Sequence, residues 1–194
     1  MDAIRNILFS GVGGQGILLA SELTAEALLQ AGYDVKKSEV HGMAQRGGSV
    51  TAQLRYGARV YSPLIEPGAA DIQMAFEMME AVRYLPYLHA GSTVIVNTQM
   101  ILPPSVATGR AAYPEKVLDE LTTRGIRVID VDAFTIAKQA GEVRTANVAL
   151  VGALSVHLDV AGDIFESVIE TRVPERFLKE NLKAFTAGRE AGAR

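Results

Sequence analysis

The sequence predicts an α/β fold with one mostly parallel sheet, and three observations support this class. A glycine-rich turn at residues 10–16 joins an apolar run at 4–9 to a long pattern of helical periodicity. Further apolar, β-branched runs at 93–97 and 127–131 alternate with amphipathic segments, as in sheets whose parallel strands are joined by helices. The length of 194 residues suits one core of this kind rather than two. We therefore expect a single Rossmann-like domain over the whole chain, 1–194, with a β-hairpin insertion and C-terminal helices.

Composition limits the classes of function. The formal net charge is −3 and the basic residues are scattered, so we expect neither nucleic acid nor a membrane as a partner. The chain has no cysteine, which excludes disulfides, thiol catalysis and iron–sulfur clusters held by its own thiolates. The three histidines lie far apart in sequence, and no metal site is predicted. No apolar run reaches the ~20 residues of a membrane span and a strand begins by residue 4, from which we expect a cytoplasmic protein.

The turn after the first predicted strand is the main candidate for a binding site. Gly11, Gly13 and Gly16 have the spacing G-x-G-x-x-G, and Gly14 and Gln15 lie between the last two. In this context the glycines permit a tight turn, and the helix that follows offers unpaired N–H groups to a phosphate or carboxylate. A structural turn without a ligand is the alternative.

The identity of a nucleotide at this turn stays open. A dinucleotide fold places an acidic residue for the ribose about 20 residues after the glycines. Lys36 and Lys37 occupy that region here, and the first acid beyond them is Glu39, which weakens an assignment to NAD.

The first helix should run from residue 17 to 31, where Gly32 ends it. The extended segment 34–40 should then lie parallel to the first strand. A second glycine-rich segment follows, and we expect it to converge with the first at the carboxyl edge of the sheet, where open α/β sheets bind ligands. Its candidate anion contacts are Gln45, Arg46, Gly47 and Gly48, with a plain solvent loop as the alternative.

The middle of the chain is predicted to hold a hairpin and two further strands. Residues 50–56 alternate in polarity and turn at Gly57 into 59–62, which reads as the antiparallel hairpin. A strand at 72–76 leads to a helix over 77–85, and the buried strand 93–97 ends at Asn97, which we expect to line the ligand edge. Residues 98–113 lack periodicity and are predicted to be a loop suited to partner contact.

The last part of the sequence should be helical around one more strand. Pro114 is expected to begin a helix that ends near Gly125, and Asp132 should cap a helix over 133–140 after the strand 127–131. Residues 147–158 are apolar on every side, so this helix must be buried by the chain itself or by another chain. The tail, 165–185, should form two amphipathic helices separated by Pro174.

No catalytic residue is predicted. The carboxylate pairs Asp130 with Asp132 and Glu77 with Glu80 are interpreted as helix starts and solvated faces. The chain could be a nucleotide-handling enzyme, or a ligand-binding subunit whose chemistry is carried by a partner. The missing cysteines and catalytic groups favour the second.

Three stretches together resemble the gamma module of the 2-oxoacid:ferredoxin oxidoreductases, and within that family the small (beta) subunits of indolepyruvate:ferredoxin oxidoreductases. They are residues 11–16 (GVGGQG), 38–49 (SEVHGMAQRGGS) and 61–65 (YSPLI). Later stretches agree, namely 91–98 (GSTVIVNT), 147–154 (NVALVGAL), and Asn181 with Phe185. The resemblance covers nearly the whole chain as one gamma-type domain.

The resemblance implies an oxidative decarboxylation of aryl 2-oxoacids to aryl-acyl-CoA, with electrons passed to ferredoxin. Thiamine diphosphate and iron–sulfur clusters would sit on a larger alpha subunit, and the small subunit alone would be inactive. Coenzyme A would be the cosubstrate at this chain. The implied contacts fall on the two glycine segments, and the role is carried over one by one to Gly13, Gly14, Gln15, Gly16 and Arg46.

Two other functions stay open. The chain could be a gamma subunit acting on another 2-oxoacid, such as pyruvate or a branched-chain acid. It could also be a free-standing reductase that binds NAD(P) or FAD, with Lys36 and Lys37 placed for a 2′-phosphate. When isolated, the chain could form a homodimer through its glycine loops and the apolar segment 147–158.

Overall fold

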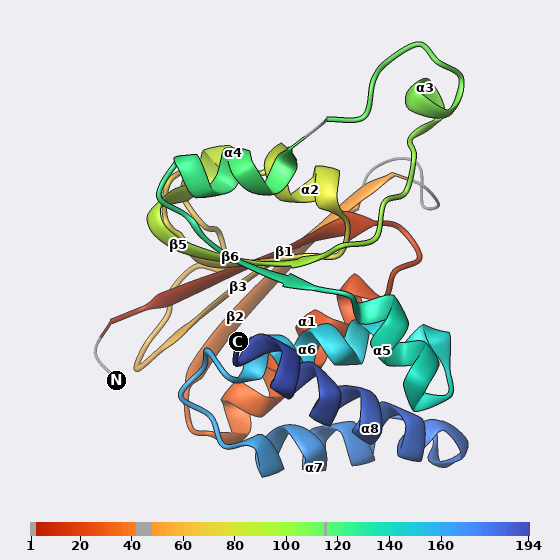
Figure 1. Ribbon diagram of the computed structural model, residues 1–194. Helices are drawn as coiled ribbons and strands as arrows, with labels where there is room; N and C mark the ends of the chain where they lie inside the picture. Colours follow the sequence, from red (N-terminus) through yellow and green to blue (C-terminus); the bar gives the residue numbers. More distant parts are fainter. Residues whose placement is uncertain (1–2, 42–47, 115) are drawn as a thin grey trace.

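A computed structural model describes residues 3–41, 48–114 and 116–194. Within these ranges one sheet has the strand order β2-β3-β1-β4-β5-β6, and every strand except β3 runs in the same direction (Figure 1). The expectation of a mostly parallel sheet in an α/β fold is confirmed. The strands are β1 (Arg5–Val12), β2 (Asp34–His41), β3 (Ser49–Gly57), β4 (Ala70–Ala75), β5 (Leu88–Asn97) and β6 (Arg127–Val131).

Helices cover both faces of the sheet. Figure 1 shows one layer below the sheet, formed by α1 (Ile17–Gln30), α5 (Ala133–Ala140), α6 (Ala146–Ser155), α7 (Gly162–Arg172) and α8 (Glu175–Gly192). The layer above the sheet is smaller and holds α2 (Met78–Arg83) and α4 (Val117–Thr123). Short helical turns lie at η1 (Leu85–Tyr87), η2 (Val143–Thr145) and α3 (Pro104–Ala107), and α3 projects away from the body of the molecule.

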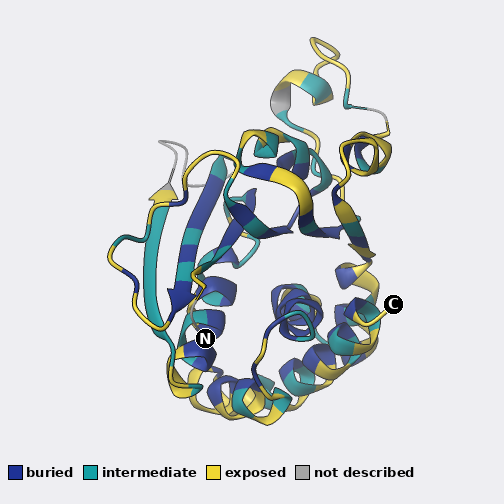
Figure 2. Cartoon of the chain, turned by 90° about the vertical axis from the view of Figure 1, so that its left-hand side faces the viewer, coloured by how far each residue is buried: buried dark blue, intermediate teal, exposed yellow. Residues whose placement is uncertain are grey.

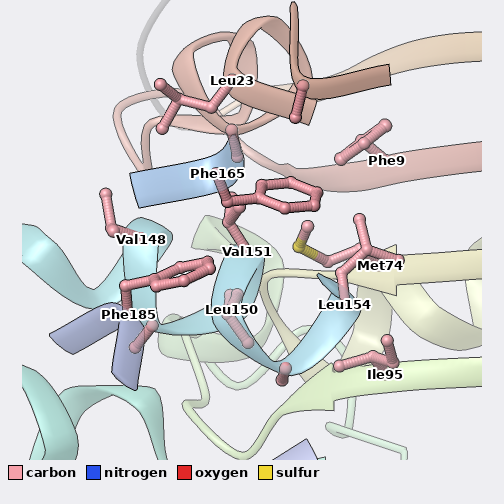
Figure 3. Packing of buried hydrophobic residues seen from close by; sticks show 14 of the residues in the cluster. Phe9, Leu23, Met74, Ile95, Val148, Leu150, Val151, Leu154, Phe165 and Phe185 are labelled. Carbon is pink, nitrogen blue, oxygen red and sulfur yellow. The ribbon is translucent and has the colours of Figure 1, made fainter. Parts of the chain in front are cut away.

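Each layer has its own core. Successive residues of β1 point to opposite faces, so Ile7 and Phe9 are buried under the lower helices and Leu8 is buried under α2 and α4. Because both faces of the central strands are covered, these strands are almost continuously apolar. Figure 2 shows the buried residues gathered between the layers, and Figure 3 shows Phe165 and Phe185 packed near the α6 side chains beneath the sheet.

Helix α6 is buried by this chain. All residues from Asn147 to Ser155 are buried, and α8 packs along the helix through small residues. An added Cβ at Gly188 would lie 1.9 Å from the carbonyl oxygen of Ala149, so the two backbones touch here. The apolar character of residues 147–158 therefore reflects an internal core.

The prediction that residues 50–56 and 59–62 pair as a hairpin is wrong. Residues 59–62 form no strand, and β3 instead pairs antiparallel with β2 on one side and with β1 on the other. Strand β2 does run parallel to β1, but β3 lies between them. The alternation at 50–56 identified the strand correctly, whereas its pairing depended on the long-range order of the sheet.

Most of the other helices and strands lie close to their predicted positions. The helix after the glycine turn, the strands predicted at 93–97 and 127–131, and the break at Pro174 are confirmed. The strand predicted at 72–76 is β4, which runs from Ala70 to Ala75. Asp132 caps α5 by accepting a hydrogen bond from the Thr135 N–H at 2.9 Å, as expected. Pro114 does not begin a helix, because α4 starts at Val117. In the ranges that the structure describes, we find no helix of the length and apolarity that a membrane crossing requires.

Candidate ligand-binding cleft

A cleft of about 420 Å³ opens at the carboxyl edge of the sheet. The lining comes from the glycine turn, the ends of β4 and β5, and the starts of α5 and α6, as predicted for an open α/β sheet. Its lining residues are Gly14, Gln15, Gly16, Phe76, Asn97, Gln99, Ile101, Phe134, Val143, Arg144, Ala146, Asn147 and Leu150. Among these described residues Arg144 is the only titratable side chain, so the cleft is suited to binding rather than to acid–base chemistry.

Each of these glycines in and beside the first turn is required for its own structural reason. Gly14 and Gly16 adopt φ values of 104° and 78°, in the left-handed region that favours glycine. Gly11 lies inside β1, where an added Cβ would be 2.7 Å from Cβ of Phe76. Gly14 is exposed with open space beside it, which leaves room for a ligand to approach the backbone.

The glycine turn contacts Gly48, at the end of the second glycine-rich segment, which agrees with the predicted convergence. The Gly13 N–H donates to the Gly48 carbonyl at 2.9 Å, and Val12 pairs with Ser49 in the ladder between β1 and β3. The turn is therefore supported by Gly11, Gly13 and Gly48, none of which lines the cleft. The candidates Gln45, Arg46 and Gly47 lie outside the described residues.

A chain of hydrogen bonds forms the floor of the cleft. Gln15 Oε1 accepts from the Val12 N–H at 2.7 Å, and Gln15 Nε2 donates to the Phe76 carbonyl at 2.8 Å. The same carbonyl accepts from Asn97 Nδ2 at 3.2 Å, while Asn97 Oδ1 accepts from the Ala133 N–H at 3.2 Å. Two amide side chains thus connect the ends of β1, β4 and β5 to the start of α5. The expectation that Asn97 lines this edge is confirmed.

The start of α1 provides the electrostatic attraction for an anion. No side chain caps this helix, and its first turn holds no acidic residue. The first N–H groups of a helix lack intrahelical partners and carry a partial positive charge. Arg144 adds a full positive charge at the rim, with its side chain 81% exposed and its Nε 3.3 Å from Glu142. The cleft therefore combines an anion-attracting end with apolar walls from Phe134, Val143 and Leu150.

Two glutamates beside the cleft are buried, and the interpretation of this pair as a helix start is confirmed for Glu77. Glu77 caps α2, accepting from the N–H groups of Met79 at 2.7 Å and Glu80 at 3.1 Å. It also accepts from the Ile101 N–H at 3.1 Å and from the Tyr113 hydroxyl. We call residues 98–113 the strap, because Glu77 holds it near both ends. Burial, and then the hydrogen bond to Glu77, raise the pKa of Tyr113 above its ordinary value.

Glu80 corrects an interpretation made from sequence. Its side chain is buried rather than on a solvated face, and it accepts from Ser49 Oγ at 2.6 Å and from Arg83 Nε at 2.8 Å. Glu80 thereby fixes the start of β3, next to the second glycine segment. No periodicity could reveal this contact, because the two residues meet only through the order of the sheet.

The geometry speaks against a dinucleotide site of the usual kind. Such a fold places β2 beside β1, where the acid at the end of β2 reaches the ribose. Here β3 separates the two strands. Lys36 pairs with Asp34, and Lys37 Nζ lies 2.6 Å from Glu39, so both lysines already have acidic partners. Across the described ranges, no three histidine or acidic side chains gather as a metal site would require.

A glycine turn that lines a cleft at the carboxyl edge of such a sheet is typical of open α/β proteins. The sequence model described as pyruvate ferredoxin/flavodoxin oxidoreductase matches residues 6–191. The chain belongs to this family.

Curated relatives specify the family further. The indolepyruvate oxidoreductase subunit IorB of Thermococcus kodakarensis is 41% identical over 190 residues, which cover 94% of this chain and 93% of the relative. IorB of Archaeoglobus fulgidus is 43% identical over 187 residues, with 94% and 92% covered. The resemblance inferred from the glycine segments is thereby confirmed.

Solved structures show the same fold. The gamma subunit of a keto/oxoacid ferredoxin oxidoreductase from Geobacter sulfurreducens has a TM-score of 0.72 and 25% identity, with 97% of this chain and 98% of that one covered. The 2-oxoglutarate:ferredoxin oxidoreductase of Magnetococcus marinus, solved with 2-oxoglutarate, coenzyme A and succinyl-CoA bound, has a TM-score of 0.78 at 20% identity. All of this chain matches 32% of that longer one. The fold thus occurs both as a separate subunit and as part of a larger chain.

Proposed function

We propose that this chain is the small subunit of an indolepyruvate:ferredoxin oxidoreductase. The observation that carries the proposal is the 41–43% identity to IorB subunits over more than nine-tenths of both partners. Related gamma subunits that act with other 2-oxoacids are the alternative, and substrate scanning of the assembled enzyme separates the two.

The overall reaction sets the task of each subunit. The bond between the carboxylate and the keto carbon of the 2-oxoacid breaks, carbon dioxide leaves, and a thioester forms with coenzyme A. Two electrons pass to two ferredoxins and one proton is released. Thiamine diphosphate and iron–sulfur clusters on a larger subunit would supply the decarboxylation and the electron transfer, since this chain has no cysteine to hold a cluster.

The task of this chain would be to bind and orient coenzyme A. The exposed Gly14, the Gly16 backbone and the uncapped start of α1 fit the diphosphate, because their N–H groups need an acceptor. Gly11, Gly13 and Gly48 would shape the turn from behind. Gln45, Arg46 and Gly47 are proposed as further contacts from their sequence alone, with Arg46 as the charged partner of a phosphate.

The test is an anaerobic pull-down of the tagged chain from its native cells. We expect a larger subunit that contains thiamine diphosphate and iron–sulfur clusters to be recovered with it. The mixture should reduce an electron acceptor with indolepyruvate, and only when coenzyme A is added. Recovery of the chain without such a subunit, or turnover that ignores coenzyme A, would overturn the proposal.

A further inference from the structure

The start of the strap forms part of the cleft wall. Gln99 and Ile101 line the cleft. Met100 and Leu102 are exposed, so the side chains of this stretch alternate between the cleft and solvent. The shape of the wall therefore depends on where the backbone of Ile101 is held.

Glu77 holds that backbone from behind the wall. Its Oε1 accepts from the Ile101 N–H at 3.1 Å and from the Tyr113 hydroxyl. Its Oε2 accepts from the N–H groups of Met79 at 2.7 Å and Glu80 at 3.1 Å, in the first turn of α2. Four donors thus converge on one fully buried carboxylate, and an ionised carboxylate has about four positions at which it can accept.

Other contacts at the start of the strap are longer. The Met78 N–H donates to the Gln99 carbonyl at 3.4 Å, and Asn97 Nδ2 donates to Gln99 Oε1 at 3.4 Å. Both distances lie beyond the usual range of about 2.7–3.2 Å for such bonds. The contact of Ile101 with Glu77 is within that range and has a charged acceptor, which makes it the stronger constraint.

The middle of the strap is hydrogen-bonded to itself. The Ser105 carbonyl accepts from the N–H groups of Arg110 at 2.8 Å and Ala111 at 3.1 Å, around the projecting helix α3 (Figure 1). These contacts shape the projecting segment. Its position relative to α2 is set at its base, where Glu77 contacts both ends.

We propose that Glu77 is a positioning residue for the ligand of the cleft, acting through Ile101. The inference rests on the proposed function, which makes coenzyme A that ligand. The affinity of the assembled enzyme for coenzyme A then depends on a carboxylate that lies behind the wall and does not line the cleft. The affinity for the 2-oxoacid does not depend on it, because the thiamine chemistry takes place on the larger subunit.

Glu77→Asp separates this role from that of a helix cap. Aspartate is a favoured cap residue, so its carboxylate can still accept from Met79 and Glu80 at the start of α2. Its side chain is one methylene group shorter and cannot reach Ile101 at the same time. The strap therefore loses its contact while the helix keeps its cap.

The experiment compares assembled enzymes that carry the native small subunit or Glu77→Asp. We expect KM for coenzyme A to rise about tenfold, the size of one lost hydrogen bond to a charged group, with kcat and KM for indolepyruvate unchanged. Hydrogen exchange followed by mass spectrometry should become faster at residues 98–103 and stay unchanged in α2. Glu66→Asp, the same substitution at an exposed position, is the matched control and should keep every native value.

Tyr113→Phe removes one contact of the same carboxylate and keeps the aromatic ring. We expect KM for coenzyme A to rise by a smaller factor, about threefold, because the contact with Ile101 remains. Tyr113→Phe combined with Glu77→Asp should raise KM no further than Glu77→Asp alone, since both substitutions act through one carboxylate.

The possible results separate the two roles. An unchanged KM for coenzyme A in Glu77→Asp would overturn the proposal, whether or not exchange at residues 98–103 becomes faster. Faster exchange in α2 as well would also overturn it, because Glu77 would then act as a helix cap alone. If Glu77→Asp fails to assemble, an unchanged KM in Tyr113→Phe refutes the proposal. An enzyme that turns over without any coenzyme A would refute the proposed function itself.

Discussion

Gln15 uses both ends of its side-chain amide within the protein. One end accepts from Val12 and the other donates to Phe76, so the side chain spans the gap between the ends of β1 and β4. A ligand in the cleft would therefore contact a Gln15 side-chain amide whose two ends already hydrogen-bond within the protein. The role we propose for Gln15 is to hold the glycine turn in shape, with the ligand contacts made by neighbouring backbone N–H groups.

A Gln15→Glu substitution tests this role through pH. A protonated carboxyl group can still donate to the Phe76 carbonyl, whereas a carboxylate would place two oxygens against each other where the amide contact is now 2.8 Å. The carbonyl and partial burial should raise the pKa of the new Glu. KM of the assembled enzyme for coenzyme A should therefore approach the native value at low pH and rise about tenfold as the pH increases through that pKa.

The matched control is Gln30→Glu, the same substitution at an exposed position at the end of α1. Its KM for coenzyme A should follow the native enzyme at every pH. If Gln15→Glu gives the same KM at all pH values, the hydrogen bond to Phe76 does not position the turn.

Single residues were predictable where their role depended on nearby sequence. The spacing of Gly11, Gly13 and Gly16 indicated the turn, and the position of Asn97 after an apolar run indicated the ligand edge. Glu80 was misread because its partner Ser49 lies on another strand. Its distance in sequence hid a contact that only the folded sheet creates.

At the scale of elements, α6 and α8 pack by backbone contact. Gly188→Ala should lower the free energy of unfolding by about 2 kcal/mol, because the added Cβ would overlap the Ala149 backbone and overpacking outweighs the gain in helix propensity. The melting temperature of the isolated chain should fall by about 4–8 °C. Thermal unfolding followed by circular dichroism measures both values.

Gly162→Ala is the control for this prediction. The nearest atoms to its added Cβ belong to the guanidinium group of Arg189, the flexible end of a side chain, at 3.0 Å. Its stability should stay within about 0.5 kcal/mol of the native chain. Equal effects of the two substitutions would mean that the α6–α8 contact can relax.

The ends of α6 and α8 are joined by a titratable group. His157 Nε2 contacts the Gly192 carbonyl at 3.0 Å, and burial, with lesser repulsion from Arg127 and Arg5, lowers the pKa of His157. Because the unfolded chain binds the proton more readily, this histidine contributes stability above its ordinary pKa of about 6.5, and the contribution is lost as the pH falls.

His157→Gln should therefore flatten the dependence of the melting temperature on pH between about pH 7 and pH 5. The glutamine can still donate to Gly192 but does not titrate in this range. His89→Gln, at an exposed histidine, should keep the native dependence. A native slope in His157→Gln would assign the effect to other groups.

The type of most elements followed from periodicity, but their pairing did not. Residues 50–56 alternate in polarity as a half-buried strand does, but no local pattern predicts that both edges of β3 pair with other strands. The apolar pattern of residues 147–158 showed that α6 is buried and left open which chain buries it. Only the small residues of α8, at Gly188 and Gly192, decide that question, and their role depends on the facing helix.

At the scale of the molecule, the sheet order bears on the choice between a subunit and a free-standing reductase. The insertion of β3 between β1 and β2 removes the usual place for a ribose-binding acid. We expect the purified chain to show no absorbance beyond the protein band, no reaction with NADH and no decarboxylation alone. Activity should appear when the larger subunit is added. A bound flavin or nicotinamide, or turnover by the isolated chain, would favour the reductase instead.

One carboxylate, that of Glu77, holds the strap at Ile101 and at Tyr113, and the strap carries α3 between these points. The segment is therefore a loop whose two ends are both fixed at the start of α2. Residues between Ile101 and Tyr113 can be added or removed without displacing the edge of the sheet, because the two contacts with Glu77 do not depend on the number of residues between them. The tip is therefore a position where an inserted reporter peptide would report on its surroundings while the cleft keeps its shape.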